Sequence, residues 1–285
     1  MEKLTRILAV VDKVEDGAVL LEKAVGLARR FGARIDLVLH ESLHAQAFAT
    51  LCSALRYREV TLTSLHRGAE RLHEAVLRCA FVTQPDLIMK AVSGEHPLNR
   101  WTCDENDYYL ANASPVPLLL VRHKAWSRPT RFAAAVDVSD DASAATARSV
   151  LQAAGFMTLG CRGHIDILYS ERERGDERAR MARAVKLAQL VREFHVGSES
   201  IQLSEGLPES TLPPIVTARQ YDVLVLGARS HRQLRETLFG TVTSRLVDAT
   251  EGDVLLVNEA VPQLHARRAA HSFREQRPDE SEQLR

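Results

Sequence analysis

The sequence predicts an α/β protein built from two tandem copies of one domain, each with an open parallel sheet covered by helices on both faces. Short apolar runs, typical of buried strands, alternate with segments of helical periodicity. The chain also repeats itself, because residues 6–12 (Arg-Ile-Leu-Ala-Val-Val-Asp) resemble residues 131–137 (Arg-Phe-Ala-Ala-Ala-Val-Asp). A repeat of this length indicates two copies of a domain rather than a solenoid of small units.

Five strands separated by helices are predicted in the first half. The strands cover residues 6–11, 34–39, 59–64, 86–90 and 117–121. The second helix of this half, around residues 43–55, is shorter than the others. This order of strands and helices is typical of doubly wound sheets, in which ligands bind at the carboxyl ends of strands.

The second half follows the same plan. Its predicted strands cover residues 131–137, 164–169, 198–203, 221–226 and 253–257. Residues 173–194 carry apolar side chains at helical spacing and predict an amphipathic helix. Pro208 lies in a turn over 205–209, and proline suits the first turn of the helix expected to follow. The last two strands of the first half lie the same number of residues before their counterparts in the second half. The segments between these strands therefore align without gaps.

The composition suits two globular domains of ordinary size, with 285 residues of which 45% are hydrophobic. We expect a first domain over residues 1–124, a second over 130–260 and a disordered tail over 261–285, which is polar and has little apolar content. The two sheets are expected to pair as a pseudo-dimer within the chain. A monomer and a homodimer of the whole chain remain alternatives.

Charge and hydropathy exclude several classes of function. The 37 basic residues balance 37 acidic ones, so no net field attracts nucleic acid or an anionic membrane. Aromatic residues make up 5%, which disfavours a base-stacking surface. The first apolar run has five residues, which is too short for a signal peptide, and the four cysteines show no C-x-x-C spacing. A cytoplasmic protein with reduced thiols is therefore predicted, without membrane or nucleic-acid partners.

A candidate anion site follows the strand 221–226. Gly227 ends the predicted strand, a loop with Ser230 follows, and Gly240 and Thr241 precede a helical segment. Backbone N–H groups at a helix start attract phosphate, and glycines allow a sharp turn and a close approach of the ligand. The alternative is an ordinary turn at Gly227 and an ordinary N-cap at Thr241.

These residues resemble the universal stress protein family. Asp137 at a strand end and the pattern Gly227-x2-Ser230-x9-Gly240-Thr241 are similar to the family's nucleotide-binding motif, G-x2-G-x9-G-[S/T]. The resemblance covers residues 4–260 and is strongest to the tandem-domain, universal stress protein E-like group. It implies an adenine-nucleotide alpha-hydrolase-like fold with two five-stranded parallel sheets in the order 3-2-1-4-5, and a cytoplasmic stress-response role.

The resemblance also implies the site residues. Adenosine would lie beside Ala135 and Asp137, the base–ribose side would be lined by Leu226 and Gly227, and the phosphates of ATP, with Mg²⁺, would meet the segment 240–242. The implied set is Ala135, Asp137, Leu226, Gly227, Ser230, Gly240, Thr241 and Val242. No catalytic residue and no metal site of the protein's own is predicted.

Two departures from the family pattern bear on binding. Ser230 stands where nucleotide binders have glycine, which costs about 1–2 kcal/mol if the position needs positive φ, unless its hydroxyl binds phosphate. In the first half, the aligned positions carry Ala91, Asp104 and Glu105, and the two carboxylates would repel a triphosphate. ATP binding is therefore predicted in the C-terminal domain only.

The predicted function is that of a non-enzymatic stress protein that binds an adenine nucleotide and an unidentified protein partner. One alternative is a weak ATPase in the same cleft, although Glu236 is the only acid in the loop. Another is a nucleotide-free interaction scaffold. His40 and His44 match the zinc signature H-E-x-x-H, but His40 ends a strand, so the two rings are not expected on one helical face.

Overall fold

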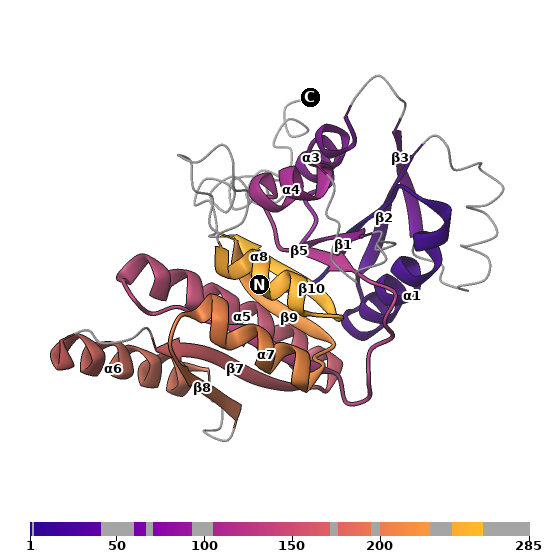
Figure 1. The fold of residues 1–285 in the computed structure, drawn as a ribbon. Coiled ribbons are helices and arrows are strands. Elements are labelled where there is room, and N and C mark those ends of the chain that lie inside the picture. The colour runs from indigo at the N-terminus through magenta and orange to yellow at the C-terminus, as the bar shows by residue number, and fades with distance from the viewer. Residues whose placement is uncertain are drawn as a thin grey trace, which may run out of the picture.

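Ten strands form a single sheet in this computed structural model, which describes residues 1, 3–40, 60–66, 71–92, 105–171, 176–194, 200–228 and 241–258 (Figure 1). The sheet order is β3-β2-β1-β4-β5-β10-β9-β6-β7-β8. The strands are β1 (Arg6–Val11), β2 (Arg34–His40), β3 (Val60–His66), β4 (Leu87–Ala91), β5 (Leu118–Val121), β6 (Arg131–Ala135), β7 (His164–Glu171), β8 (Ile201–Glu205), β9 (Val223–Ala228) and β10 (Asp253–Asn258). Every pairing is parallel except that of β5 with β10.

The two sheets expected from the sequence are joined into one by the antiparallel pairing of β5 with β10. Leu119 lies opposite Leu255, and both strands consist of buried apolar residues at this point. Each strand would otherwise be an exposed sheet edge with unpaired backbone groups, and pairing removes both edges at once. The strands of residues 6–121 and those of residues 131–258 therefore share one continuous sheet.

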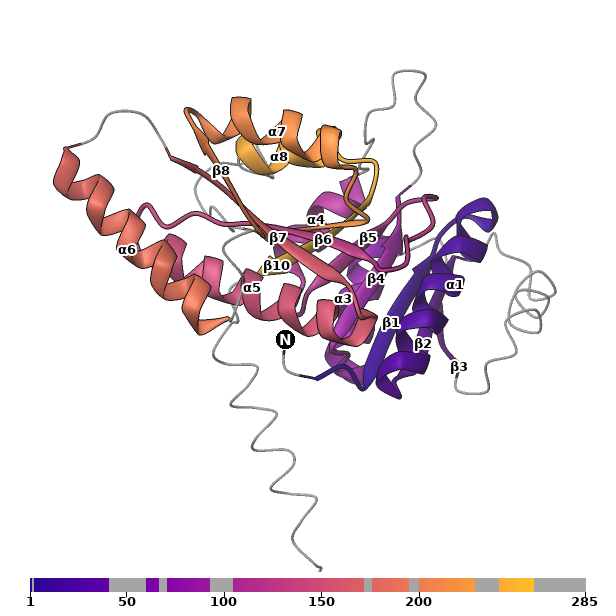
Figure 2. The ribbon, with the colours of Figure 1, turned by 90° about the horizontal axis from the view of Figure 1, so that it is seen from below.

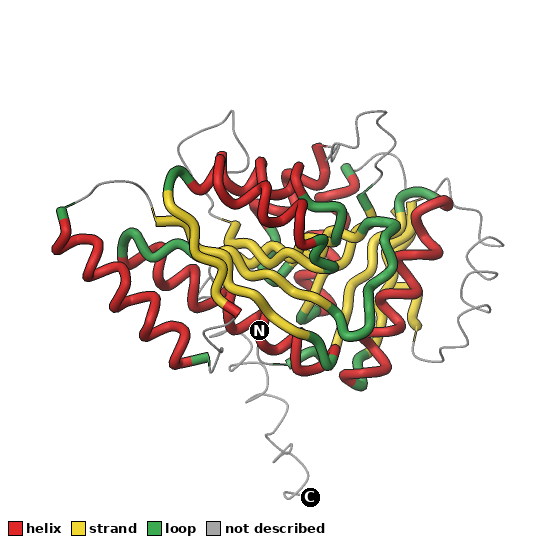
Figure 3. Tube along the Cα trace, turned by 60° about the horizontal axis from the view of Figure 1, so that its bottom comes forward, coloured by secondary structure: helices red, strands yellow, loops and turns green. Residues whose placement is uncertain are grey.

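Helices cover both faces of this sheet, giving three layers (Figures 2 and 3). One face packs against α1 (Val14–Phe31), α5 (Asp141–Cys161) and α6 (Glu177–Glu193). The other packs against α3 (Leu72–Thr83), α4 (Glu105–Ala113), α7 (Pro208–Arg219) and α8 (Thr241–Ala249). Two apolar clusters result, one on each face, and both include residues from the two halves of the chain.

The two halves use the same local devices. Helices α3 and α7 each have 12 residues and end at a glutamine in the left-handed region, Gln84 or Gln220. Asp86 and Asp222 each accept a backbone N–H bond from the arginine that begins the first strand of the same half. Pro208 takes the first turn of α7, as the sequence predicted.

A buried ion pair joins the halves at the linker. The Lys23 ammonium on α1 lies 2.8 and 2.9 Å from the carboxylate oxygens of Asp253, which begins β10. The same carboxylate accepts hydrogen bonds from the Arg122 N–H and from Trp126 Nε1. Trp126 therefore lies between the halves.

Aromatic packing adds a second contact between α1 and α5. The rings of Phe31 and Phe156 stack with centroids 4.9 Å apart. Gly160 makes room for this packing, because a Cβ there would lie 1.9 Å from Phe31 Cζ.

Several predictions fall outside the described residues. They concern the short helix over 43–55, the tail over 261–285 and His44. His40 ends β2, as predicted. Cys79 and Cys161 are free and buried. Among the helices that the structure describes, none is long and apolar enough to cross a membrane.

Candidate functional site

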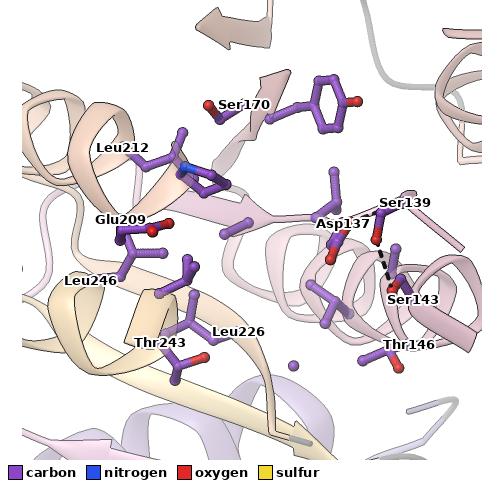
Figure 4. Close-up of a pocket in the computed structure, with 18 of the residues that line it drawn as sticks. Asp137, Ser139, Ser143, Thr146, Ser170, Glu209, Leu212, Leu226, Thr243 and Leu246 are labelled. Atoms are coloured by element: carbon purple, nitrogen blue, oxygen red, sulfur yellow. Dashed lines mark hydrogen bonds between the residues drawn. The ribbon is translucent and has the colours of Figure 1, made fainter. Parts of the chain in front are cut away.

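A cavity of about 360 Å³ opens where β6, β7 and β9 end (Figure 4). Its walls come from these strand ends and from α5, α6, α7 and α8. This is the carboxyl edge of the parallel sheet, where an open α/β sheet is expected to bind ligands. The volume lies in the range of about 300–1,000 Å³ that is usual for small-molecule pockets.

Five of the eight site residues predicted from the sequence line this cavity. They are Ala135, Asp137, Leu226, Gly227 and Val242. Thr241 begins α8 beside them, and the structure describes its backbone alone. Ser230 and Gly240 lie outside the described residues, as does the loop that contains Glu236.

The structure gives a different reason for glycine at position 227 from the turn expected at the strand end. It lies within β9, which continues to Ala228, so it does not turn the chain at a strand end. A Cβ at this position would lie 2.5 Å from Thr146 Cγ2 on α5. Gly227 therefore lets α5 approach β9 closely at the cavity wall.

The inner walls of the cavity are apolar. Ala135 comes from β6. Leu226 comes from β9, and Leu212 and Leu246 come from α7 and α8 (Figure 4). Such walls suit a planar, weakly polar group such as a nucleobase.

Hydroxyl groups gather on the α5 side. Ser139 and Ser143 lie within hydrogen-bond distance, 3.3 Å between their hydroxyl oxygens (Figure 4). Asp140 caps α5 by accepting a 2.6 Å bond from the Ser143 N–H, which fixes the start of the helix. Asp137 accepts a bond from the Ser139 N–H through Oδ1. This wall offers hydrogen-bonding groups to the polar part of a ligand.

A charged network occupies another wall. Arg183 of α6 donates to the Glu171 carboxylate, which also accepts a 2.6 Å bond from the Tyr169 hydroxyl. Burial and the bond to Glu171 raise the pKa of Tyr169. Burial alone would raise the pKa of Glu171, but the bonds from Tyr169 and Arg183 outweigh it and lower that pKa. The bond to Glu171 raises the pKa of Arg183, so this guanidinium remains charged at the cavity wall.

The start of α8 is the part of the cavity that suits an anion. Val242 and Thr243 of its first turn line the cavity, and this turn contains no acidic residue. The orphan backbone N–H groups and the dipole at a helix start favour negative charge. The arrangement fits a ligand with an apolar planar end and an anionic end.

The comparison with known proteins agrees with this geometry. The family model described as "Universal stress protein family" matches residues 131–258. Residues 131–258 belong to the universal stress protein family.

Similar proteins extend over most of the chain. The Universal stress protein E homolog of Haemophilus influenzae is 20% identical over 188 residues, which are 60% of this chain. The aligned part is 61% of that relative, so the chain spans about three fifths of the relative's length.

Solved structures show the same fold. A putative universal stress protein from Pseudomonas aeruginosa UCBPP-PA14 has a TM-score of 0.80, with 19% identity over 95% of this chain and 99% of that one. A universal stress protein from Archaeoglobus fulgidus has a TM-score of 0.62, with 12% identity over 88% of this chain and 96% of that one.

The first half has a cavity at the place that corresponds to the site of the universal stress protein domain. It measures about 410 Å³, is more open, and is lined almost entirely by polar and charged side chains, with Leu72 as the apolar exception. Glu105 and Asp107 lie in the first turn of α4, which matches α8 in length and sheet context. The acid predicted at Glu105 is therefore at a helix start, whereas Asp104 lies outside the described residues.

The sequence reasoning missed several residues that line the site of the universal stress protein domain. Ser143 and Thr146 lie three residues apart on one face of α5, a polar pair that periodicity could have revealed, and Ser139 precedes the helix. Tyr169 and Arg183 carry no comparable signal, because their meeting depends on how α6 lies against β7.

Proposed function

We propose that the chain is a non-enzymatic, cytoplasmic stress protein that binds an adenine nucleotide, ATP with Mg²⁺, in its C-terminal half alone. In this proposal residues 130–260 form the binding domain and residues 1–124 a degenerate second copy. The observation that carries it is the convergence of Ala135, Asp137, Leu226, Gly227 and Val242 on one cavity.

The residues present fit an adenine nucleotide. The apolar side chains at Ala135, Leu212 and Leu226 suit the base, and the hydroxyls of Ser139 and Ser143 suit a ribose. The acid-free first turn of α8 suits the phosphates. Mg²⁺ would arrive with the phosphates, since this ion commonly binds through phosphate oxygens and keeps several waters.

Two features favour binding over hydrolysis. The first turn of α8 supplies no carboxylate that could activate a water or hold a metal beside the phosphates. The Ser139 N–H already binds Asp137 Oδ1, so this carboxylate oxygen is engaged within its own loop. We therefore favour a role in which bound nucleotide changes a surface that a protein partner recognises.

The test places a charge at the proposed phosphate position. Val242→Asp adds a carboxylate to the first turn of α8, where it suits the helix dipole but repels phosphate. Val242→Asn is the matched control, with the same shape and no charge. By isothermal titration calorimetry of the full chain, we expect ATP and ADP to bind about tenfold more weakly to the Asp variant than to the Asn variant. Adenosine, which has no phosphate, should bind both alike.

Other results would contradict the proposal in different ways. Equal ATP affinity in the two variants would place the phosphates away from α8. A wild-type chain that binds none of these ligands would favour the nucleotide-free scaffold. Release of phosphate from ATP that disappears in Val242→Asp would favour the weak ATPase.

A further inference from the structure

A buried ion cluster lies inside the first half. Lys90 of β4 has its Nζ 2.9 Å from Asp12 Oδ2 and 2.7 Å from Asp107 Oδ1. Lys90 and Asp107 are each 1% exposed, and the side chain of Asp12 is 12% exposed. Ion pairs in so little solvent are rare unless the charges satisfy one another.

The cluster occupies positions that correspond one by one to the cavity of the second half. The pairing of Leu87 with Ile7 of β1 matches that of Val223 with Phe132 of β6. Lys90 lies three residues after Leu87, and Leu226 lies three residues after Val223. Asp107 is the third residue of α4, and Thr243 is the third residue of α8, both of them nine-residue helices.

Asp12 and Asp137 complete the correspondence. Asp12 follows β1 directly, and Asp137 comes just after β6, the matching first strand of the second half. In the second half, Asp137, Leu226 and Thr243 all line the cavity. In the first half, an ammonium group held by two carboxylates lies at the equivalent place.

We propose that Asp12, Lys90 and Asp107 fill the inner part of the cleft of the first half, so that a side chain takes the place of a ligand there and a polar outer cavity remains. The chain would then have one cleft that is open down to its apolar wall and one whose inner part is permanently filled. The identity of the excluded ligand, an adenine nucleotide, rests on the proposed function. The filling of the cleft by the three side chains does not.

Physical chemistry explains why such a closure would be selective. A ligand that displaced the Lys90 ammonium would leave two carboxylates buried without their cation, which is strongly unfavourable. A phosphate group would also meet Glu105 and Asp107 in the first turn of α4, where they already satisfy the helix dipole. The remaining depression over the cluster is polar and lacks the apolar wall that a base requires.

The test exchanges the residues between the two halves in the full chain. Lys90→Leu with Asp107→Thr gives the first cleft the residues of the second. It should extend the existing cavity beside Asp12 inward to β4, as seen by crystallography. By calorimetry this variant should bind a second equivalent of adenosine, a probe without phosphate. Leu226→Lys with Thr243→Asp is the reciprocal variant. Circular dichroism should show that it remains folded, and its affinity for adenosine should be at least tenfold lower than that of wild type.

The outcomes separate the closure from the proposed function. A folded Lys90→Leu/Asp107→Thr variant whose crystal structure shows no enlargement of the cavity toward β4 would overturn the closure. A reciprocal variant that binds adenosine as tightly as wild type would overturn it too. If wild type binds no adenosine or nucleotide, the proposed function fails, and the cavity in the crystal structure still decides the closure. If the first variant does not fold, the reciprocal variant decides it.

Discussion

Gly227 allows a strand and a helix to meet at the wall of the cavity, and this makes it sensitive to the smallest substitution. In Gly227→Ala the added methyl group would lie 2.5 Å from Thr146 Cγ2, so one of the two elements must shift. We expect a loss of about 1–3 kcal/mol in the free energy of unfolding, which is typical of overpacking. Urea denaturation followed by circular dichroism measures it.

A second substitution provides the control for this clash. Thr146→Ser removes the methyl group and keeps the hydroxyl, which donates to the Ala142 carbonyl at 3.1 Å. The double variant Gly227→Ala with Thr146→Ser should recover most of the lost stability. A double variant as unstable as Gly227→Ala alone would mean that Gly227 is required for a reason other than this contact.

Whether a single site residue can be predicted from the sequence depends on the element that carries it. Asp137 comes just after β6 and Leu226 is one of the last three residues of β9, so the strand pattern places both near one edge of a parallel sheet. Lys90 also comes from a strand, but its pairing with Asp107 depends on the position of α4. Long-range contacts of this kind are set by packing, which periodicity does not reveal.

At the scale of elements, α5 is positioned by its N-cap. Asp140 accepts the Ser143 N–H at 2.6 Å, and the first turns of α5 carry Ser143 and Thr146 into the cavity wall. Asp140→Ala should cost about 0.5–2 kcal/mol, because one orphan N–H of the helix loses its partner. Thermal or urea unfolding of the full chain measures this loss.

Asp140→Ser is the matched control for the cap, since serine also accepts from a helix N–H. It should retain most of the stability that Asp140→Ala loses. If serine is as harmful as alanine, the carboxylate contributes through its charge or through another contact rather than through the cap.

Strands were predicted better than their ends. The run predicted at 221–226 extends as β9 to Ala228, because Gly227 and Ala228 pair with Val257 and Asn258 of β10. The strand predicted at 198–203 is observed as β8, Ile201–Glu205. Apolar runs indicate that a strand exists, but its last residues depend on the partner strand, which lies far away in sequence.

At the scale of the whole molecule, the sequence predicted the duplicated plan but left open how the two sheets meet. The continuous sheet depends on the edges of β5 and β10, which carry apolar residues that would suit any buried strand. Periodicity contains no information on which edge pairs with which. From the sequence we could therefore predict that the two sheets pair, but not that β5 and β10 form the contact.

The ion pair between Lys23 and Asp253 also joins the two halves, but its burial removes both charged groups from water, which is unfavourable. Burial lowers the pKa of the Lys23 ammonium and raises the pKa of the Asp253 carboxyl, even though each attracts the other. Desolvation therefore outweighs attraction at both groups. Asp253 is fully buried, so removal of its cation should be the most damaging change at the junction.

Lys23→Met should destabilise the chain by about 3–5 kcal/mol near neutral pH, because it leaves the Asp253 carboxylate buried without its cation. Without Lys23 the pKa of Asp253 rises further.

A carboxyl with a raised folded-state pKa contributes stability that is complete below its unfolded-state pKa and is lost as the pH rises through the folded-state value. Urea denaturation from about pH 8 to about pH 5 should therefore show the loss shrinking as the pH falls. Lys23→Met with Asp253→Asn has no carboxyl to titrate, so its stability difference from wild type should lack this recovery in acid. A loss in Lys23→Met that is equal across the whole range would mean that packing of the lysine stem, and not its charge, stabilises the junction.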